Sequence, residues 1–294
     1  MLQLRALCRR FGPVPALDDV TFAVRPGVLT GFIGANGAGK TTAMRIVVGV
    51  LAPDSGDVLW DGAPVGSDQR RRFGYMPEER GLYPRMTVLD QLVFFARLHG
   101  IAPDAADRRA RVLLDELRLG ARAGDQVQKL SLGNQQRAQV GAALVHDPEL
   151  LVLDEPFSGL DPVAVDVLAA LLRRRAAAGV PVLFSSHQLD LVERLCDDIV
   201  IINRGRVLAS GHARELRSQR AGARYRLQLG ADAGWLRDEP GVRVLDVAGE
   251  AALVELLRVE DDQRLLTRAL AHGPVHEFRR AIPTLAEIFR EAVT

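Results

Sequence analysis

A glycine-rich segment at residues 34–42, GANGAGKTT, narrows the possible folds of this chain more than any other stretch. It follows an apolar run at 29–33 that is typical of a buried strand, and it precedes an apolar run at 43–50 that predicts a helix. Its glycines allow the backbone to pass through positive φ, so that successive N–H groups can point at one centre. The segment therefore predicts a strand, a loop and a helix that together hold an anion.

Two side chains of this loop fit phosphate chemistry. Lys40 can reach the β- and γ-phosphates of a nucleotide as a point charge, and Thr41 can offer its hydroxyl to Mg²⁺. The N-terminus of the following helix adds a partial positive charge. The chain has 38 basic residues, yet only Lys40 and Lys129 are lysines, and the planar fork of arginine is not equivalent to a compact ammonium. These features favour a phosphate site over the alternative, a flexible glycine-rich turn.

Length and composition exclude several other classes of protein. With 294 residues, 48% of them hydrophobic, the chain can form one large or two moderate globular domains. A net charge of +1 gives no general electrostatic reason to expect nucleic acid or an anionic membrane as the main partner. Cys8 and Cys196 are too few for a disulfide framework, which suits a reducing cytosol. Charges such as Asp166 interrupt the apolar runs, so we expect that any function in a membrane needs a separate subunit. The N-terminus is unlike a signal peptide, so we expect the chain to stay in the cytosol.

Polar residues follow two apolar runs that read as buried parallel strands. Asp154 and Glu155 come directly after the run at 150–153, and His187 follows the run at 180–184 by way of two serines. Because ligands gather at the carboxyl ends of strands in open α/β sheets, we expect these side chains to face the glycine-rich loop. Asp154 would then hold Mg²⁺, Glu155 would poise an attacking water and His187 would donate to a γ-phosphate. The alternatives are a solvated acidic turn and a structural histidine.

The order of strands and helices predicts an α/β fold built on a doubly wound sheet, with an early antiparallel β subdomain and an inserted helical region at about residues 86–146. Within that region Thr87 is expected to cap one helix and Ser131 another, whose start Gly133 keeps open. Phe11 lies before the glycine-rich loop, where it either stacks on a base or fills the core.

The C-terminal part is expected to form a second, smaller α+β domain. We expect the main domain at residues 1–212, an Arg-rich linker at 213–224 and the small domain at 225–294. Strands are predicted at 225–229, 242–247, 252–259 and 275–279, a helix at 261–271, and a last helix that starts with a capping box of Thr284 and Glu287. This domain carries no evident catalytic cluster and is interpreted as an accessory or interaction module.

Taken together, the motifs over residues 2–212 resemble the ATP-binding subunit of ABC transporters, which are P-loop NTPases. The family's P-loop matches residues 34–42, and its signature loop, which opens the signature helix, matches residues 130–135. The resemblance implies that two subunits sandwich two ATP, each held by one P-loop and the partner's signature helix. It also implies a role for Phe11 in stacking on adenine and for Asp154, Glu155 and His187 in Mg²⁺ binding and hydrolysis. The ATP-binding residues that it implies are Phe11, Gly34, Ala35, Asn36, Gly37, Ala38, Gly39, Lys40, Thr41, Thr42, Ser131, Gly133 and Asn134.

The resemblance narrows to a branch of bacterial exporters that includes sodium-extrusion and drug-export ATPases. The stretches YMPEERGLYPRMTVLDQL, LSLGNQQ and PTLAEIFREAV carry it. It implies a homodimer that works with a separately encoded permease at the cytoplasmic face of the membrane, without nucleic acid. Two positions depart from the family pattern. Glu78 replaces the usual glutamine that contacts Mg²⁺, although it can still accept from metal-bound water, and Leu132 and Asn134 replace the usual glycine and glutamine of the signature loop.

Three other functions compete with transport. A soluble ABC ATPase acting on ribosomes or DNA is disfavoured, because such relatives generally carry two cassettes or long coiled coils and this chain has one cassette without sustained heptads. A regulatory module that does not hydrolyse ATP is expected to lack the glutamate that stands at position 155. A P-loop kinase is disfavoured because neither the signature loop nor His187 would have a role in it.

Overall fold

The structure of the protein, a computed structural model, describes residues 1–79, 81–221 and 223–293. The chain divides into two compact units, Met1–Ala213 and Arg214–Thr294. Within the described ranges no helix combines the length and the apolar character that crossing a membrane requires. The sequence-based prediction of a doubly wound sheet, an antiparallel subdomain, a helical insertion and a C-terminal α+β region matches these units in secondary structure.

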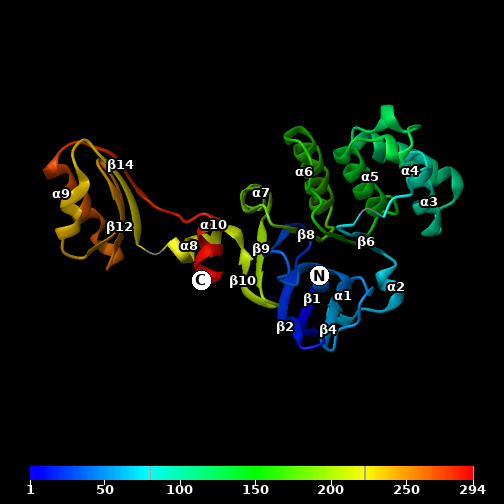
Figure 1. Ribbon diagram of the computed structural model, residues 1–294, viewed down its shortest axis with the longest axis horizontal. Helices are drawn as coiled ribbons and strands as arrows, with labels where there is room; N and C mark the ends of the chain where they lie inside the picture. The colour runs from blue at the N-terminus through cyan, green and yellow to red at the C-terminus, as the bar shows by residue number, and fades with distance from the viewer. Residues whose placement is uncertain (80, 222, 294) are drawn as a thin grey trace. The chain divides into compact units, whose positions relative to one another are not determined.

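The first unit is built around a six-stranded sheet (Figure 1). Its strands are parallel except for the edge strand β10, and residues of β3, β7 and β8 are buried throughout. Both faces are therefore covered, as expected for a parallel sheet. The strand order is β10 (Arg206–His212), β9 (Asp198–Asn203), β3 (Leu29–Ile33), β8 (Val182–Ser186), β7 (Leu150–Leu153) and β6 (Phe73–Met76).

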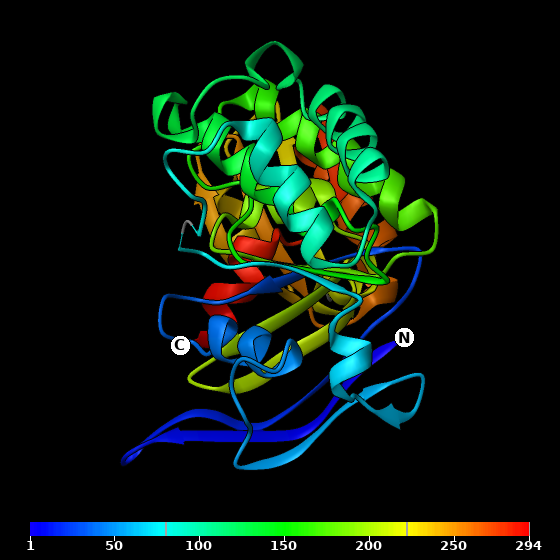
Figure 2. The same ribbon diagram turned by 90° about the vertical axis from the view of Figure 1, so that its right-hand side faces the viewer.

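Helix α1 (Lys40–Val47) lies between one face of this sheet and a second, antiparallel sheet (Figures 1 and 2). Met44 and Ile46 of α1 are fully buried in a cluster that includes Phe22 of the antiparallel sheet and Phe32 of β3. The opposite face packs against α6 (Pro162–Ala177) and α7 (Leu189–Leu195). The antiparallel sheet has the order β2 (Val14–Val24), β1 (Leu2–Phe11), β4 (Ser55–Trp60) and β5 (Ala63–Pro64).

The helical insertion lies beyond the β6 edge of the large sheet (Figure 1). It comprises α3 (Val88–Leu98), α4 (Pro103–Glu116) and α5 (Leu132–Leu144), with short 3₁₀ turns at Gly120–Arg122 and Val127–Lys129. The predicted cap of α3 is present, because the Thr87 hydroxyl accepts the N–H of Asp90 at 3.1 Å. The short helices α2 (Ser67–Arg70) and α7 were not predicted from the sequence.

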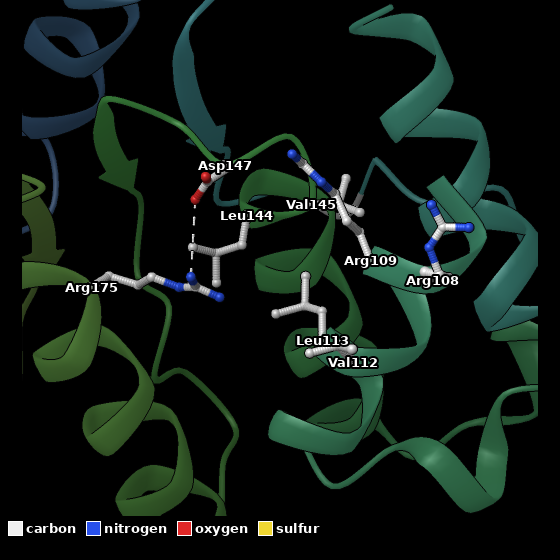
Figure 3. A pocket seen from close by; sticks show the side chains of 8 residues that line it. All are labelled: Arg108, Arg109, Val112, Leu113, Leu144, Val145, Asp147 and Arg175. Atoms are coloured by element: carbon white, nitrogen blue, oxygen red, sulfur yellow. Dashed lines mark ion pairs between the residues drawn. The ribbon is translucent and has the colours of Figure 1, made fainter. Parts of the chain in front are cut away.

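Ion pairs tie the insertion to α6 across a pocket of about 320 Å³ (Figure 3). Arg175 of α6 lies 3.0 Å from Glu116 of α4 and 4.0 Å from Asp147, which follows α5. Leu113 and Leu144 line the same pocket. Partly exposed ion pairs each contribute little to stability. We therefore expect these contacts between α6 and the helical insertion to contribute only a small free energy of stabilisation.

A histidine pair near the end of α5 gives the first unit a pH-dependent stability. His146 stacks on His99 with ring centroids 3.7 Å apart and planes 6° from parallel. Burial, and next the proximity of His99, lower the pKa of His146 to about 4. The unfolded imidazole, with a pKa of about 6.5, binds a proton more tightly. The stability of the neutral pair is therefore present above pH about 6.5 and lost as the pH falls towards 4.

We predict that His146→Phe flattens this dependence, because a phenyl ring can stack on His99 but cannot bind a proton. The urea midpoint of unfolding of the first unit should fall between pH 6.5 and 4 in the wild type, and fall less in the variant. His276→Phe, which alters an exposed histidine of the second unit, is the matched control. Equal slopes in wild type and His146→Phe would contradict the assignment.

The second unit contains a four-stranded antiparallel sheet with the order β12 (Val242–Ala248), β13 (Ala251–Leu256), β11 (Arg224–Leu229) and β14 (Val275–Arg280). One face packs against α9 (Asp262–His272) and the 3₁₀ turn Ala233–Asp238, with Leu227, Val254 and Leu265 at the centre. The final helix α10 (Leu285–Val293) begins with the predicted capping box, in which the N–H of Thr284 donates to Glu287 at 2.7 Å and the N–H of Glu287 donates to Thr284 at 3.2 Å.

Three details of this region differ from the sequence-based prediction. The Arg-rich segment at 213–224, for which no helix was predicted, contains α8 (Ala213–Ala221), because its Ala, Arg, Glu, Leu and Gln residues are strong helix formers. The strand predicted at 252–259 ends at Leu256 and gives way to a 3₁₀ turn at Val259–Asp261. The 3₁₀ turn at Ala233–Asp238 was not predicted.

Candidate functional site

The glycine-rich loop connects β3, which ends at Ile33 as predicted, to α1, which spans Lys40–Val47 and so begins three residues before the predicted 43–50. Two of its glycines are needed for the path of the chain. Gly39 has a φ of 110°, and a Cβ on it would lie 2.5 Å from the carbonyl oxygen of Ala16. A Cβ on Gly34 would lie 2.6 Å from the carbonyl oxygen of Ile202. The loop is therefore held closely against β2 and β9, and only glycine fits at these positions.

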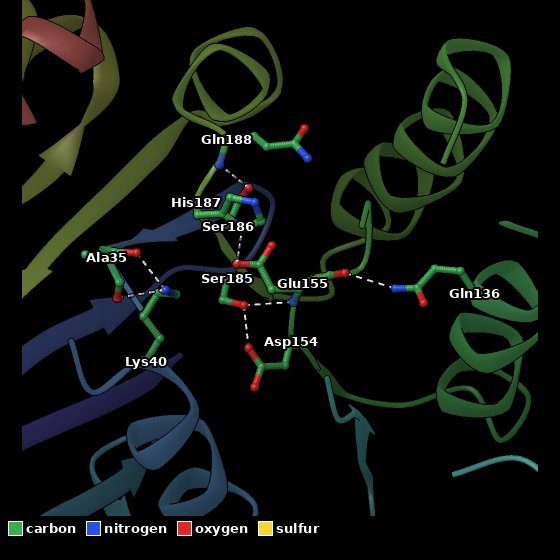
Figure 4. Close-up of polar contacts among 10 residues, drawn as sticks. Ala35, Lys40, Gln136, Asp154, Glu155, Ser185, Ser186, His187 and Gln188 are labelled. Carbon is green, nitrogen blue, oxygen red and sulfur yellow. Dashed lines mark hydrogen bonds and ion pairs between the residues drawn. The ribbon is translucent and has the colours of Figure 1, made fainter. Parts of the chain in front are cut away.

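Lys40 is buried inside this loop, with 7% of its surface exposed. Its ammonium donates to the carbonyl oxygens of Gly34 at 2.6 Å and Ala35 at 3.3 Å (Figure 4). An ammonium has three donors, so one remains for an anion at the mouth of the loop. The loop itself orients the charge that a phosphate would meet.

A pocket of about 350 Å³ opens in front of the loop. Three carboxylates face the loop across it, each emerging after a neighbouring parallel strand: Glu78 after β6, and Asp154 and Glu155 after β7. Asp154 and Glu155 thus lie across from the loop, as expected for acids at the carboxyl ends of parallel strands, whereas His187 is not among the lining residues. The lining residues are Ala16, Asn36, Gly37, Ala38, Gly39, Lys40, Thr41, Thr42, Glu78, Asp154 and Glu155.

Ser185, a residue that the sequence analysis did not single out, joins the two acids of β7 (Figure 4). It is fully buried in β8. Its hydroxyl donates to Oδ1 of Asp154 at 2.5 Å and accepts the backbone N–H of Glu155 at 2.8 Å. One side chain thus fixes both the carboxylate of Asp154 and the backbone of Glu155.

Glu155 is held in an unusual backbone conformation, with a φ of 51°. Its N–H is bound by Ser185, and its carbonyl oxygen accepts from the side chain of Gln136 in α5 at 2.9 Å. Its carboxylate lies 3.0 Å from Nδ1 of His187. A left-handed glutamate persists only when its surroundings determine it, and here side chains from β8, from α5 and from the residue after β8 do so. The carboxylate is thereby aimed at the phosphate pocket that it lines.

The residues at the pocket fit a magnesium ion bound together with phosphates. Oδ2 of Asp154 is buried and has no hydrogen-bond partner among the described residues, and the Thr41 side chain lines the same pocket. Both are hard oxygen donors of the kind that Mg²⁺ prefers. Within the described part of the chain no cluster of three or more His, Cys, Asp or Glu residues could hold a metal alone. Mg²⁺ is usually bound by one or two carboxylates plus substrate phosphates, and Asp154 offers such a carboxylate at the phosphate pocket.

Helix α5 reaches the site at a second place. Gln139, buried and three residues after Gln136, donates its amide to the carbonyl oxygens of Pro77 at 2.8 Å and Glu79 at 3.0 Å. The loop that carries Glu78 is therefore fixed by the helical insertion. Through Gln136 and Gln139 a displacement of α5 would move both Glu155 and Glu78.

Six of the predicted ATP-binding residues do not line this pocket, and neither does His187; the six are Phe11, Gly34, Ala35, Ser131, Gly133 and Asn134. Phe11 is 52% exposed at the end of β1, which excludes the core-filling alternative, and the guanidinium of Arg9 lies 5.2 Å from its ring. Ser131 caps α5 as predicted, accepting the N–H of Asn134 at 3.4 Å, and it is exposed. Gly133 lies beside Gly159 in the turn before α6. Within one chain the signature helix therefore starts on the surface, outside the phosphate pocket.

These features define a class of protein. A glycine-rich loop with a buried lysine, facing an aspartate and a glutamate at the carboxyl edge of a parallel sheet, is the site of a P-loop nucleoside triphosphatase. Residues 17–158 match the ABC transporter family, and residues 211–293 match the C-terminal domain of DrrA1-3-like ATP-binding proteins.

Sequence relatives of the chain include ATP-binding proteins of ABC transporters and of exporters. It is 34% identical over 293 residues to YhaQ, an uncharacterized ABC transporter ATP-binding protein of Bacillus subtilis, in a match that covers 100% of this chain and 98% of that protein. It is 36% identical over 241 residues to the Nod factor export ATP-binding protein I of Burkholderia lata, covering 81% of this chain and 79% of that protein. It is 33% identical over 225 residues to the linearmycin resistance ATP-binding protein LnrL of Bacillus subtilis, covering 76% of this chain and 72% of that protein.

Solved structures agree with this placement. An ATP-binding subunit of an ABC transporter superposes with a TM-score of 0.68 at 34% identity, covering 74% of this chain and 92% of that chain. A bacterial ABC transporter cassette solved as a dimer shares the fold, with a TM-score of 0.66 at 23% identity over 72% of this chain and 99% of that chain. The chain belongs to the ATP-binding subunits of ABC transporters, and it is an ATPase.

Proposed function

We propose that two copies of this chain bind and hydrolyse ATP between them, and that their closure drives export through a separate membrane permease. The observation that carries the hydrolytic part is the fixed position of Glu155. Its backbone is bound by Ser185 and Gln136, and its carboxylate, which lines the phosphate pocket, contacts His187. Hydrolysis of a phosphoanhydride asks a protein mainly for positioning and charge neutralisation, which this network provides.

Each side chain has a proposed part in the reaction. Residues 34–42 cradle the phosphates, Lys40 neutralises their charge, and the exposed Phe11 stacks on adenine. Glu155 orients and deprotonates the attacking water, while His187 holds Glu155 through Nδ1 and presents its other ring edge to the γ-phosphate. Mg²⁺, held by Thr41 and Asp154 with Glu78 accepting from its waters, would supply further neutralisation of phosphate charge.

The surface position of the signature helix supports the dimer. Ser131, Gly133 and Asn134 lie outside the phosphate pocket of their own chain, so they reach a triphosphate only in another copy. The N-terminus of α5, with its free backbone N–H groups, suits a γ-phosphate. A cassette that shares the fold was solved as a dimer, which is in keeping with a dimeric arrangement here.

The export partner is proposed from the relatives and from one exposed cluster. Two relatives are named for Nod factor export and for linearmycin resistance. Tyr83, which is 51% exposed, packs edge-on against Phe94 and stacks on Phe95, next to the loop that Gln139 holds. A partly exposed aromatic cluster beside a loop that carries Glu78 suits a permease that senses the nucleotide site at the cytoplasmic face of the membrane.

The test is reconstitution of the chain with its copurifying permease in liposomes, with the ATPase subunits on the outside. We expect the permease to stimulate ATP hydrolysis and a solute to accumulate in the lumen, and Glu155→Gln to abolish both. Hydrolysis that no membrane protein changes, together with cosedimentation of the chain with ribosomes, would instead favour the alternative of a soluble ABC ATPase.

We predict that Ser185→Ala lowers both turnover and Mg²⁺ affinity by about 10- to 100-fold, because Asp154 and Glu155 each lose a buried hydrogen bond. Phosphate release measured against Mg²⁺ concentration gives both quantities. Ser186→Ala is the matched control, since Ser186 is also buried but binds the N–H of Gln188 instead. If the two variants behave alike, Ser185 has no special role in placing the acids.

A further inference from the structure

One face of the sheet in the second unit carries several charged residues. Alternate residues of β11 face the core with α9, including Tyr225 and Leu227, so Arg224 and Arg226 lie on the opposite face. In the same way Arg279 of β14 lies on that opposite face, directly across from Arg226. We name the residues Arg224, Arg226 and Arg279 the arginine face.

Residues that lie opposite one another on neighbouring strands form rows across this face. Positive and negative charges alternate in one of these rows but not in the next. In the first row Glu255 lies between two arginines, 3.3 Å from Arg224 and 3.5 Å from Arg243. In the next row the neighbours of Arg226 are Leu253 and Arg279, so two arginines stand directly opposite each other. Like charges in that position destabilise a sheet.

The available carboxylates do not neutralise this second row. Arg279 forms an ion pair with Glu277 on its own strand. Arg226, in contrast, makes no ion pair with any residue for which the structure gives a position. With Arg279 paired and Arg226 not, the row keeps an excess of positive charge, which an anion between the two arginines would neutralise.

A pocket of about 290 Å³ lies over these two arginines. It is also lined by Arg224, by Arg217 of α8 and by the residues that lead into α10. Arg217 donates to the carbonyl oxygen of Pro283 at 2.9 Å, which fixes the wall of the pocket next to the start of that helix. Glu287 is the acidic residue of the lining, and it is engaged in the capping box with Thr284.

We propose that this pocket binds a phosphate-bearing anion between Arg226 and Arg279. Guanidinium groups match the geometry of phosphate oxygens with paired hydrogen bonds, and a dianion removes the repulsion of the cross-strand pair. The site uses no residue of the P-loop pocket and is independent of the proposed transport function. Its ligand is a phosphate monoester, whether carried by a small metabolite or by a lipid headgroup.

The test is calorimetric titration of the full chain with glycerol 3-phosphate, with the P-loop first saturated by Mg²⁺ and a non-hydrolysable ATP analogue. We expect binding at one site per chain, weakened roughly tenfold or more by Arg226→Gln and by Arg279→Gln. Arg243→Gln, which alters an arginine of the first row outside the pocket, should bind as the wild type does. Absence of binding, or equal binding by Arg226→Gln, would overturn the proposal.

Two further measurements sharpen the result. Arg226→Glu should abolish binding and yet raise the melting temperature of the apo chain, because it turns the like-charged pair into an ion pair with Arg279. A lower melting temperature in that variant would contradict the claimed repulsion. The source of the phosphate monoester is identified with vesicles containing phosphatidic acid, and vesicles of phosphatidylserine serve as the control. Tighter binding to phosphatidic acid than to glycerol 3-phosphate identifies a lipid headgroup as the source. Tighter binding to glycerol 3-phosphate identifies a soluble metabolite.

Discussion

Glu155→Gln is expected to lower the rate of ATP hydrolysis by about 10²- to 10⁴-fold, the range that a positioned general base contributes. Glutamine has the size of glutamate, and its side-chain oxygen can still accept from Nδ1 of His187. The backbone contacts with Ser185 and Gln136 do not involve the altered group. The variant therefore loses the base and keeps the geometry around it.

Nucleotide binding should survive in Glu155→Gln or become tighter. The phosphate pocket is lined by three carboxylates, so removing one negative charge reduces repulsion of the triphosphate. Phosphate release gives turnover, equilibrium dialysis gives ATP affinity, and gel filtration with ATP and Mg²⁺ should show a lasting dimer. Glu79→Gln removes a charge from the same neighbourhood but outside the pocket lining, and should hydrolyse ATP as the wild type does. Wild-type turnover in Glu155→Gln would mean that another group acts as the base.

The parts of this site that could be predicted from the sequence are those that follow from local pattern and from the rule of strand ends. The glycine spacing gives the loop, and apolar runs followed by acids place Asp154 and Glu155 at the same edge of the sheet as Lys40. Neither inference needs knowledge of which side chains touch. Because parallel strands bring their carboxyl ends to one edge, the pattern alone was sufficient.

The residues that hold these acids could not be predicted in the same way. Ser185, Gln136 and Gln139 act through tertiary contacts, and a buried serine or glutamine has many possible partners in a sequence. The sequence contains one indication of these contacts. Gln136 and Gln139 are three residues apart, so they share a face of α5. Polar residues repeated on a buried helical face need partners, and here these partners are the backbone groups around the active-site carboxylates.

Helix α8 was missed for a different reason. Its residues are strong helix formers but have almost no apolar periodicity, so the charge-rich segment was interpreted as a linker. Pattern-based prediction depends on an amphipathic face, and a helix that is polar nearly all round gives no such signal. The cross-strand position of Arg226 and Arg279 is likewise a matter of register, which becomes visible only when β11 and β14 are paired.

Ser131→Arg is expected to prevent the ATP-dependent dimer and to lower turnover more than tenfold, while leaving ATP binding by the single chain unchanged. Ser131 is exposed at the start of α5 and lies outside the phosphate pocket of its own chain, so a long side chain there does not reach that chain's nucleotide. In a closed dimer it would stand where the partner's triphosphate has to fit.

Loss of the helix cap must be separated from this steric effect, and Ser131→Ala does so. Both variants lose the bond to the N–H of Asn134, at a cost of about 1 kcal/mol to the helix, but only arginine adds bulk. In the Glu155→Gln background, where dimers should last, gel filtration with ATP is expected to show dimers for Ser131→Ala and monomers for Ser131→Arg. A Ser131→Arg chain that dimerises with ATP would show that the signature helix does not complete the partner's site. A chain that no longer binds ATP as a monomer would show that Ser131 acts within its own pocket.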